Sequence, residues 1–356
     1  SLTLPKSLTT IKGAVFYGCS GLTSVRLPEN LSEIGERAFC GCSSLKKLEI
    51  PSSVMSIGES CLEGCKSLEE LVIPFVGIEK SPQSPSKNTL LGTLFGTREC
   101  DGCIKTEQHF KTFYIPEKLS RVTVTGNSDL YYAFYNCCNI KEVNLNNVCF
   151  IGEKTFCGCS SLTNLNLPES LTAIGVSAFW GCPALESIVI PRNVSSINQH
   201  AFSNSTDLKT VKLQTSRFLD DAYTLGRIFG NCVQEYIFDV DSLTTNAVYG
   251  ISNLSRLTVG QSCTAIEKNA LYSATIDTLW ISKDMAYIGN QDVTVGHFFY
   301  QGSEADWNRV VNESELEPDE FGIPSIYERD GVKYGIEPNS NSASVIKAPN
   351  TAKVYI

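Results

Sequence analysis

The sequence predicts a fold of the α/β repeat class, a strand-rich solenoid whose coils stack into a curved parallel sheet and return through short helical or irregular segments. Two observations predict it. The phrases IGERAFCGCSSLKKLEIP (34–51) and IGEKTFCGCSSLTNLNLP (151–168) agree at twelve of eighteen positions. Within three runs, a leading apolar residue also recurs every 21–23 residues, at Leu22, Leu45 and Leu68, at Leu119, Ile140, Leu162, Leu185 and Leu208, and at Leu254 and Ile276. Such an interval is too short for a strand and a full-length helix.

Each repeat opens with an alternating segment such as LTSVRLP, LKKLEIP or LESIVIP. Alternation of apolar and polar residues predicts a strand with one buried face, and the proline that follows ends the strand because it cannot donate to a ladder. A second apolar pair then closes on Gly35, Gly58, Gly152 or Gly175, which we expect to permit a tight turn. The Ala-Phe pair that comes next is expected to place one aromatic ring in the interior of each coil.

Two longer stretches interrupt the period, at about 75–118 and 214–253. Both run into the same phrase, LSRVTV at 119–124 and LSRLTV at 254–259, so we expect each to replace an ordinary coil by an irregular double coil. The polar segment GIEKSPQSPSKN (77–88) predicts a projecting surface loop. The sequence therefore predicts a solenoid over residues 1–310 and a C-terminal segment, 311–356, that leads into a further, truncated repeat.

The phrases IPSSVMSIGESCLEGCKSLEEL and IPRNVSSINQHAFSNSTDLKTV resemble the BspA-like, Treponema-type leucine-rich repeat. The late segment FFYQGSEADWNRV (298–310) also resembles one that recurs in this family. The resemblance covers nearly the whole chain. It implies a leucine-rich-repeat right-handed solenoid, display on a bacterial cell surface, and adhesion or recognition without a common enzyme activity.

Seven of the fifteen cysteines share one position of the repeat, three residues after the Phe or its substitute. They are Cys19, Cys42, Cys65, Cys137, Cys159, Cys182 and Cys232. Ser205 stands at this position in another repeat, so the position accepts a small side chain with a hydrogen-bond donor. We interpret these residues as a structural ladder that donates to turn carbonyls, and we expect no metal ion there.

Cys100 and Cys103 stand apart, as a C-x-x-C pair inside the first irregular stretch with His109 nearby. A zinc site needs four ligands and usually two such pairs. A loop disulfide or two free thiols therefore fits this pair better than metal or redox chemistry, and we expect no cofactor.

Charge and motifs argue against several function classes. The net charge of −9 disfavours nucleic acid and anionic membranes as partners. The sequence holds no apolar run long enough to span a bilayer, and no hydrolase, zinc-protease or nucleotide-binding signature. Among the three histidines, His200 is predicted to lie on the coil surface, and His297, among apolar residues, to be structural rather than a general base. We predict no catalytic site.

The outward residues of the predicted strands form rows across the sheet. Charged neighbours in these rows are expected to pair: Arg26 with Glu49, Lys47 with Glu70, and Arg121 with Glu142. Such exposed pairs contribute about 0–1 kcal/mol each. No acidic or basic stripe emerges, which disfavours an ionic polymer as the ligand of this face.

The rows differ near the C-terminal end. If VGHFFY is the next strand, Phe299 is expected beside Trp280 and near Arg256 and Thr258. An exposed tryptophan beside an arginine is typical of protein or glycan contact sites; a capping or interdomain contact is the alternative. Tyr114 and the loop around 81–88 form a second candidate surface.

These observations predict a non-catalytic module that is secreted or displayed at the cell surface. It would bind a host or cell-surface macromolecule, protein or glycan, while any secretion signal or anchor is expected outside this sequence. A structural stalk that presents another domain is the first alternative. A hydrolase or redox protein that uses the Cys100/Cys103 loop is the second.

Overall fold

The computed structural model describes residues 1–80, 89–126, 129–219 and 224–322, and the strands at 327–329, 332–336 and 343–347. The chain forms a parallel β-solenoid of about 13 turns with few helices, which confirms the predicted repeat fold. Two compact units make it up. Unit 1 holds Ser1–Val211 and Leu225–Val233, and unit 2 holds Lys212–Thr224 and Gln234–Ile356.

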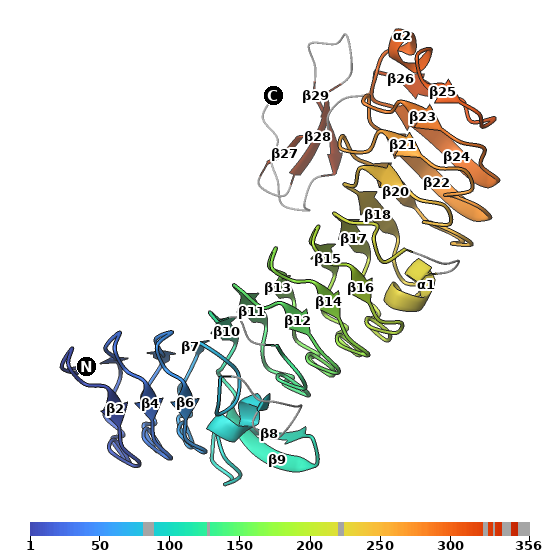
Figure 1. The fold of residues 1–356 in the computed structure, drawn as a ribbon. Helices are drawn as coiled ribbons and strands as arrows, with labels where there is room; N and C mark the ends of the chain where they lie inside the picture. The colour runs from blue at the N-terminus through green and yellow to red at the C-terminus, as the bar shows by residue number, and fades with distance from the viewer. Residues whose placement is uncertain are drawn as a thin grey trace. The chain divides into compact units, whose positions relative to one another are not determined.

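The opening segment of each repeat forms a short strand, and these strands pair in parallel as predicted (Figure 1). In the first part of the chain they are β1 (Leu2–Thr3), β3 (Val25–Arg26), β5 (Lys47–Glu49), β7 (Glu70–Ile73), β10 (Arg121–Val124), β11 (Glu142–Leu145), β13 (Asn164–Asn166), β15 (Ser187–Ile190) and β17 (Thr210–Leu213). Within unit 1, β5, β7, β10, β11 and β13 form one sheet in this order. In unit 2 the sheet runs through β18 (Glu235–Phe238), β20 (Arg256–Val259), β22 (Ala274–Ile281), β24 (Val293–Tyr300) and β26 (Glu320–Phe321).

The second apolar pair of each repeat forms a two-residue strand. These strands are β2 (Thr10–Ile11), β4 (Glu33–Ile34), β6 (Ser56–Ile57), β12 (Phe150–Ile151), β14 (Ala173–Ile174) and β16 (Ser196–Ile197) in unit 1, and β19 (Ser242–Leu243), β21 (Ala265–Ile266), β23 (Tyr287–Ile288) and β25 (Val311–Asn312) in unit 2. They pair in parallel as three separate sheets: β2-β4-β6, β12-β14-β16 and β19-β21-β23-β25.

The glycines that follow these strands are needed for a reason other than the one expected. Gly35 and Gly58 do not adopt a left-handed backbone. Instead, a Cβ atom at Gly58 would lie 2.1 Å from the backbone nitrogen of Glu36 in the preceding coil, and one at Gly35 would lie 2.4 Å from that of Gly13. A turn does begin at Gly35, where the Ala38 N–H donates to the Gly35 carbonyl. Because neither glycine needs a left-handed backbone for it, the close approach of neighbouring backbones is what requires glycine here. The left-handed positions lie elsewhere, as at Gly181 with φ +70°.

The interior of unit 1 is filled by a stack of phenylalanine rings. Phe134, Phe156, Phe179, Phe202 and Phe229 follow one another with ring centroids 4.6–5.2 Å apart, and all five are fully buried. Each aromatic pair contributes about 0.5–1.5 kcal/mol beyond its buried area. The predicted role of the Ala-Phe pair is confirmed, because the coil spacing places like rings on one another.

Five of the seven cysteines at the ladder position donate hydrogen bonds to carbonyls of the preceding coil, as predicted, whereas Cys137 accepts one from Gln108 Nε2. The Sγ of Cys65 donates to the carbonyl of Phe39 at 3.2 Å, and the Sγ of Cys159 donates to that of Phe134 at 3.0 Å. Cys42, Cys182 and Cys232 also donate to carbonyls of the preceding coil, and the Ser205 hydroxyl does so in its own repeat. Cys19, in the first coil, is exposed. Burial raises the pKa of the Cys182 thiol to about 12, so these thiols stay protonated donors.

The first irregular stretch inserts a 3-10 helix (Leu91–Leu94) and an antiparallel hairpin of β8 (Cys103–Gln108) and β9 (Lys111–Pro116). It adds no strand to the parallel sheet among the described residues, because β7 pairs directly with β10. Gln108, fully buried, bridges the insertion. Its Oε1 accepts from the Gly92 N–H at 2.8 Å, while its Nε2 donates to the Tyr135 carbonyl at 2.7 Å and lies 3.4 Å from the ladder sulfur of Cys137.

The second irregular stretch is organised differently. It contains the helix α1 (Thr224–Phe229) and also a regular strand, β18, which pairs with β20. We did not predict this strand. Val233 stands 21 residues before Leu254 and leads the segment VQEYIF, so the repeat pattern continues there with Tyr236 and Phe238 in place of aliphatic residues.

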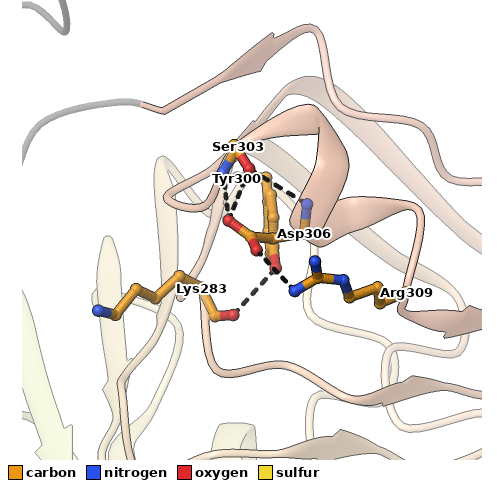
Figure 2. Close-up of polar contacts among 5 residues, drawn as sticks. All are labelled: Lys283, Tyr300, Ser303, Asp306 and Arg309. Atoms are coloured by element: carbon orange, nitrogen blue, oxygen red, sulfur yellow. Dashed lines mark hydrogen bonds and ion pairs between the residues drawn. The ribbon is translucent and has the colours of Figure 1, made fainter.

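The segment after residue 300 closes the last described coil of unit 2. Figure 2 shows Ser303 capping the short helix α2 (Glu304–Trp307): its hydroxyl accepts from the Asp306 N–H, and the Asp306 carboxylate accepts from the Ser303 N–H and hydroxyl. These bonds lower the pKa of the Asp306 carboxyl. Trp307 packs edge-on against Tyr300, with ring centroids 5.1 Å apart, and the Tyr300 hydroxyl donates to the Lys283 carbonyl.

The chain beyond this coil was expected to lead into another parallel repeat. Within this segment β25 and β26 pair in parallel with β23 and β24, whereas β27 (Tyr327–Arg329), β28 (Val332–Ile336) and β29 (Ala343–Lys347) pair antiparallel with one another. The further, truncated repeat stays a prediction. Antiparallel strands need only short connections, whereas each parallel repeat needs a full coil of chain.

Candidate functional site

The candidate site of unit 2 lies on the outward face of the sheet formed by β20, β22 and β24. Alternation along these strands buries Leu257, Leu279 and Phe298. The residues that follow them, Thr258, Trp280 and Phe299, therefore lie on the opposite face.

The strand register brings three of the predicted residues into one row. Thr258 pairs with Trp280, and Trp280 pairs with Phe299. The rings of Trp280 and Phe299 are tilted at 44° with centroids 5.0 Å apart, and both side chains are half-buried. The predicted neighbourhood is confirmed in its geometry, and a binding role for it stays a prediction.

The polar groups beside this row are incompletely satisfied. Arg256 is held by Glu235 of the neighbouring strand, with 3.7 Å between Nη1 and Oε1. Five buried side-chain nitrogen or oxygen atoms of the described residues have no hydrogen-bond partner, and two of them are Arg256 Nε and Trp280 Nε1. A buried donor without an acceptor costs about 1–3 kcal/mol.

His297 differs from the prediction. We expected a structural residue among apolar neighbours, but its side chain is 70% exposed and its Nδ1 lies 3.7 Å from Asp319 Oδ2. The physical reason is the period of the strand: His297 shares the outward face with Phe299, and their rings lie 6.2 Å apart. His200 is exposed, as predicted, and His109 is exposed as well.

The charged row of unit 1 is linked differently from the expected pairs. Lys47 and Glu70 form the expected ion pair, at 2.7 Å. Arg121 lies opposite Glu70 on β7 and also opposite Glu142 on β11, but it pairs with Glu70 at 3.2 Å. The Glu142 carboxylate instead accepts from Asn144 Nδ2 at 2.8 Å. The expected pair of Arg121 with Glu142 is therefore wrong.

Tyr114, the remaining candidate, lies on β9 of unit 1 and is half-buried, opposite Lys105 across the hairpin. Tyr114 therefore belongs to a different unit from Trp280 and Phe299. The loop expected to share this candidate surface with it, residues 81–88, lies outside the described residues.

Cys100 and Cys103 form a disulfide, one of the two arrangements that we favoured. Within the described ranges, no group of three or more His, Cys, Asp or Glu side chains could hold a metal ion. In the same part of the chain no helix has the length and apolar character needed to cross a membrane.

Comparison with known proteins identifies the repeat. The family model for the BspA type leucine rich repeat region matches residues 1–93, 130–237 and 226–293, in six copies. No curated protein matches the sequence. Among solved structures, a leucine-rich repeat protein from Bacteroides ovatus is 17% identical, with 88% of this chain and 77% of that chain covered and a TM-score of 0.32.

Two other solved structures are similar. A leucine rich cell surface protein from Faecalibacterium prausnitzii is 18% identical, over 88% of this chain and 91% of that one, with a TM-score of 0.31. A leucine rich repeat protein from T. pallidum is 25% identical, over 51% of this chain and 76% of that one, with a TM-score of 0.32. Because the family model covers well over half of the residues, the chain belongs to the BspA-type leucine-rich repeat family.

Proposed function

We propose that this chain is a non-catalytic recognition module displayed at a bacterial cell surface, and that the sheet face around Trp280 and Phe299 binds a protein or glycan on a host or neighbouring cell. The family supports the coarser part of this proposal, since its members are typically interaction or surface modules. The observation that carries the site is the adjacent pair of half-buried aromatic rings, Trp280 and Phe299, on an outward sheet face.

Three features of this face support binding. Tryptophan and arginine are the residue types enriched at the energetic centres of protein interfaces. Thr258 adjoins Trp280 in the row, and Arg256 lies on the same strand two residues away. Trp280 Nε1 and Arg256 Nε have no hydrogen-bond partner among the described residues, and a functional role is one of the explanations for such buried groups.

The test is a binding screen of the purified protein against host matrix proteins and mucosal glycans. For a ligand found in this way, the Trp280→Ala/Phe299→Ala variant is expected to raise the Kd by at least about 30-fold, because truncation of central aromatic residues costs about 2 kcal/mol or more. Trp180→Ala is the matched control, because this tryptophan is also exposed, at 42%, but lies off the sheet face.

Circular dichroism must confirm that both variants are folded. Equal loss of binding in the two variants would contradict the site. Full binding by the Trp280→Ala/Phe299→Ala variant would move recognition to another surface. Absence of any ligand would favour a stalk that presents another domain.

A further inference from the structure

The tip of the β8–β9 hairpin places two aromatic residues in a strained turn. Gln108 pairs with Lys111, so His109 and Phe110 form a two-residue loop, with φ of +44° and +67°. Loops of this geometry usually carry Asn-Gly, because bulky side chains are disfavoured at positive φ. Phe110 is also completely exposed. Neither the strain nor the exposure helps the chain to fold, and residues held in this way cluster at ligand sites.

The hairpin is held firmly against the next coil. The buried amide of Gln108 anchors its end, and Phe113 on the second strand is buried. The Nδ2 of Asn136 also donates to the Glu107 carbonyl at 2.8 Å. The tip is therefore positioned before any ligand arrives, which lowers the entropy cost of binding.

A cavity of about 430 Å³ lies between this tip and the coil that carries Tyr132 and Tyr135. The ring centroid of His109 lies 5.1 Å from that of Tyr132, which lies 6.0 Å from that of Tyr135. A cavity of this size fits a small ligand. A folded protein partner would need roughly 800 Å² of surface on each side, so the cavity alone suits one or two rings of a small molecule.

The charged residues that line the cavity favour a negatively charged ligand. Lys154 Nζ already lies 5.7 Å from the Tyr132 ring centroid, where a cationic ligand would otherwise sit. Lys154 and Glu153 lie 3.4 Å apart, and Glu107 is paired with Lys105 at 3.5 Å. Lys111, next to Phe110, has no ion-pair partner among the described residues. One ammonium group therefore remains available for an anion.

We propose that this cavity binds an acidic carbohydrate. A pyranose ring presents C–H groups to aromatic faces and hydroxyls to polar groups, and the lining supplies both, through Phe110 and Tyr135 and through the Glu107 carboxylate. The carboxylate of the sugar pairs with Lys111. The site belongs to unit 1 and does not depend on the sheet face proposed above, which belongs to unit 2.

The test is calorimetric titration with 3′-sialyllactose and digalacturonic acid as acidic probes, lactose as the neutral probe, and hexaglutamate as an acidic peptide. At least one acidic sugar is expected to bind at least 10-fold more tightly than lactose and hexaglutamate, and Lys111→Gln is expected to remove that preference. Lactose binding with equal affinity would refute the acidic class, and tighter binding of hexaglutamate would refute the carbohydrate. No binding of either acidic sugar at millimolar concentration would overturn the proposal.

A second variant separates binding from folding. His109→Asn/Phe110→Gly installs the residues that this turn prefers, so the unfolding temperature is expected to stay the same or rise while affinity for the acidic sugar falls at least 10-fold. Tyr135→Ala should also weaken binding, whereas Tyr17→Ala, at the same position of another coil and away from the cavity, should not. Unchanged affinity in the Asn-Gly variant would overturn the role of the tip.

Discussion

Gly58→Ala tests whether the close approach of neighbouring coils limits the repeat. The added Cβ would lie 2.1 Å from the Glu36 nitrogen and 2.3 Å from its Cα, about 1 Å closer than side chains tolerate. The clash falls beside the hydrogen bond from the Gly58 N–H to the Ile34 carbonyl, 2.7 Å long, which the coils must lengthen to relieve it. Overpacking of this kind costs about 1–3 kcal/mol, and a weakened bond adds about 1 kcal/mol. We expect a loss of about 2–4 kcal/mol.

Two other glycines of unit 1 provide controls that separate contact from conformation. Gly181 has φ +70°, and its nearest neighbour, the Gly158 nitrogen, lies at an ordinary 3.9 Å, so Gly181→Ala should cost only the left-handed penalty of about 1–2 kcal/mol. Gly21 has neither positive φ nor an atom within 4 Å of its added Cβ. Gly21→Ala should be neutral or stabilise by about 0.4–1 kcal/mol.

Urea unfolding followed by far-ultraviolet circular dichroism measures all three free energies under one condition. Gly58→Asn belongs in the same series, because asparagine tolerates left-handed backbone but not a backbone clash. A Gly58→Ala variant that loses no more stability than Gly181→Ala, or a Gly58→Asn variant as stable as wild type, would refute the contact argument.

Four further outcomes follow from the ladder and the hairpin. Cys182→Ser should retain stability because the hydroxyl still donates, whereas Cys182→Ala should lose about 1 kcal/mol in urea unfolding. Ellman's reagent at pH 8 should label the exposed thiols Cys19 and Cys149 in the native protein, while Cys182, whose pKa burial raises to about 12, reacts only after unfolding. Because the folded-state pKa of Cys182 lies above the ordinary 9.0, this thiol contributes stability that is present below pH 9 and is lost as the pH rises through 12. The urea midpoint of Cys182→Ser should therefore fall less between pH 9 and 11 than that of the wild type. Gln108→Ala should cost about 1–3 kcal/mol, because it leaves the buried Gly92 N–H without its acceptor, and should speed proteolysis of the hairpin.

The periodic part of the fold could be predicted because every coil meets the same environment. The alternation in LKKLEIP and LESIVIP is enough to place strands, and the exchange of Cys for Ser205 at one position is enough to indicate a small donor. His297 could have been placed by the same logic, since the period of two puts it on the face of Phe299 and not with Phe298.

The remaining features depend on distances between coils, which spacing within one repeat does not contain. The need for glycine at Gly58 follows from how near Glu36 lies in the adjacent coil. The ion pair of Arg121 with Glu70 follows from the inserted segment leaving the sheet, which places residues 51 positions apart side by side. The hairpin cavity likewise depends on Gln108, which lies in the inserted stretch and does not recur at any position of the repeat.

The two proposed sites, the sheet face at Trp280 and the cavity at the hairpin tip, are built in different ways. It can therefore be tested whether one site depends on the other. Trp280 and Phe299 occupy regular outward positions, where side chains can change without disturbing the backbone. The hairpin tip requires an insertion, and Gln108 replaces hydrogen bonds that a regular coil would make. Because each coil of a solenoid contacts only its neighbours, the strain of an insertion stays local. Gln108→Ala should therefore weaken acidic-sugar binding and leave ligand binding at the Trp280 face unchanged; a parallel loss at both sites would mean that the coils do not behave as nearest-neighbour units.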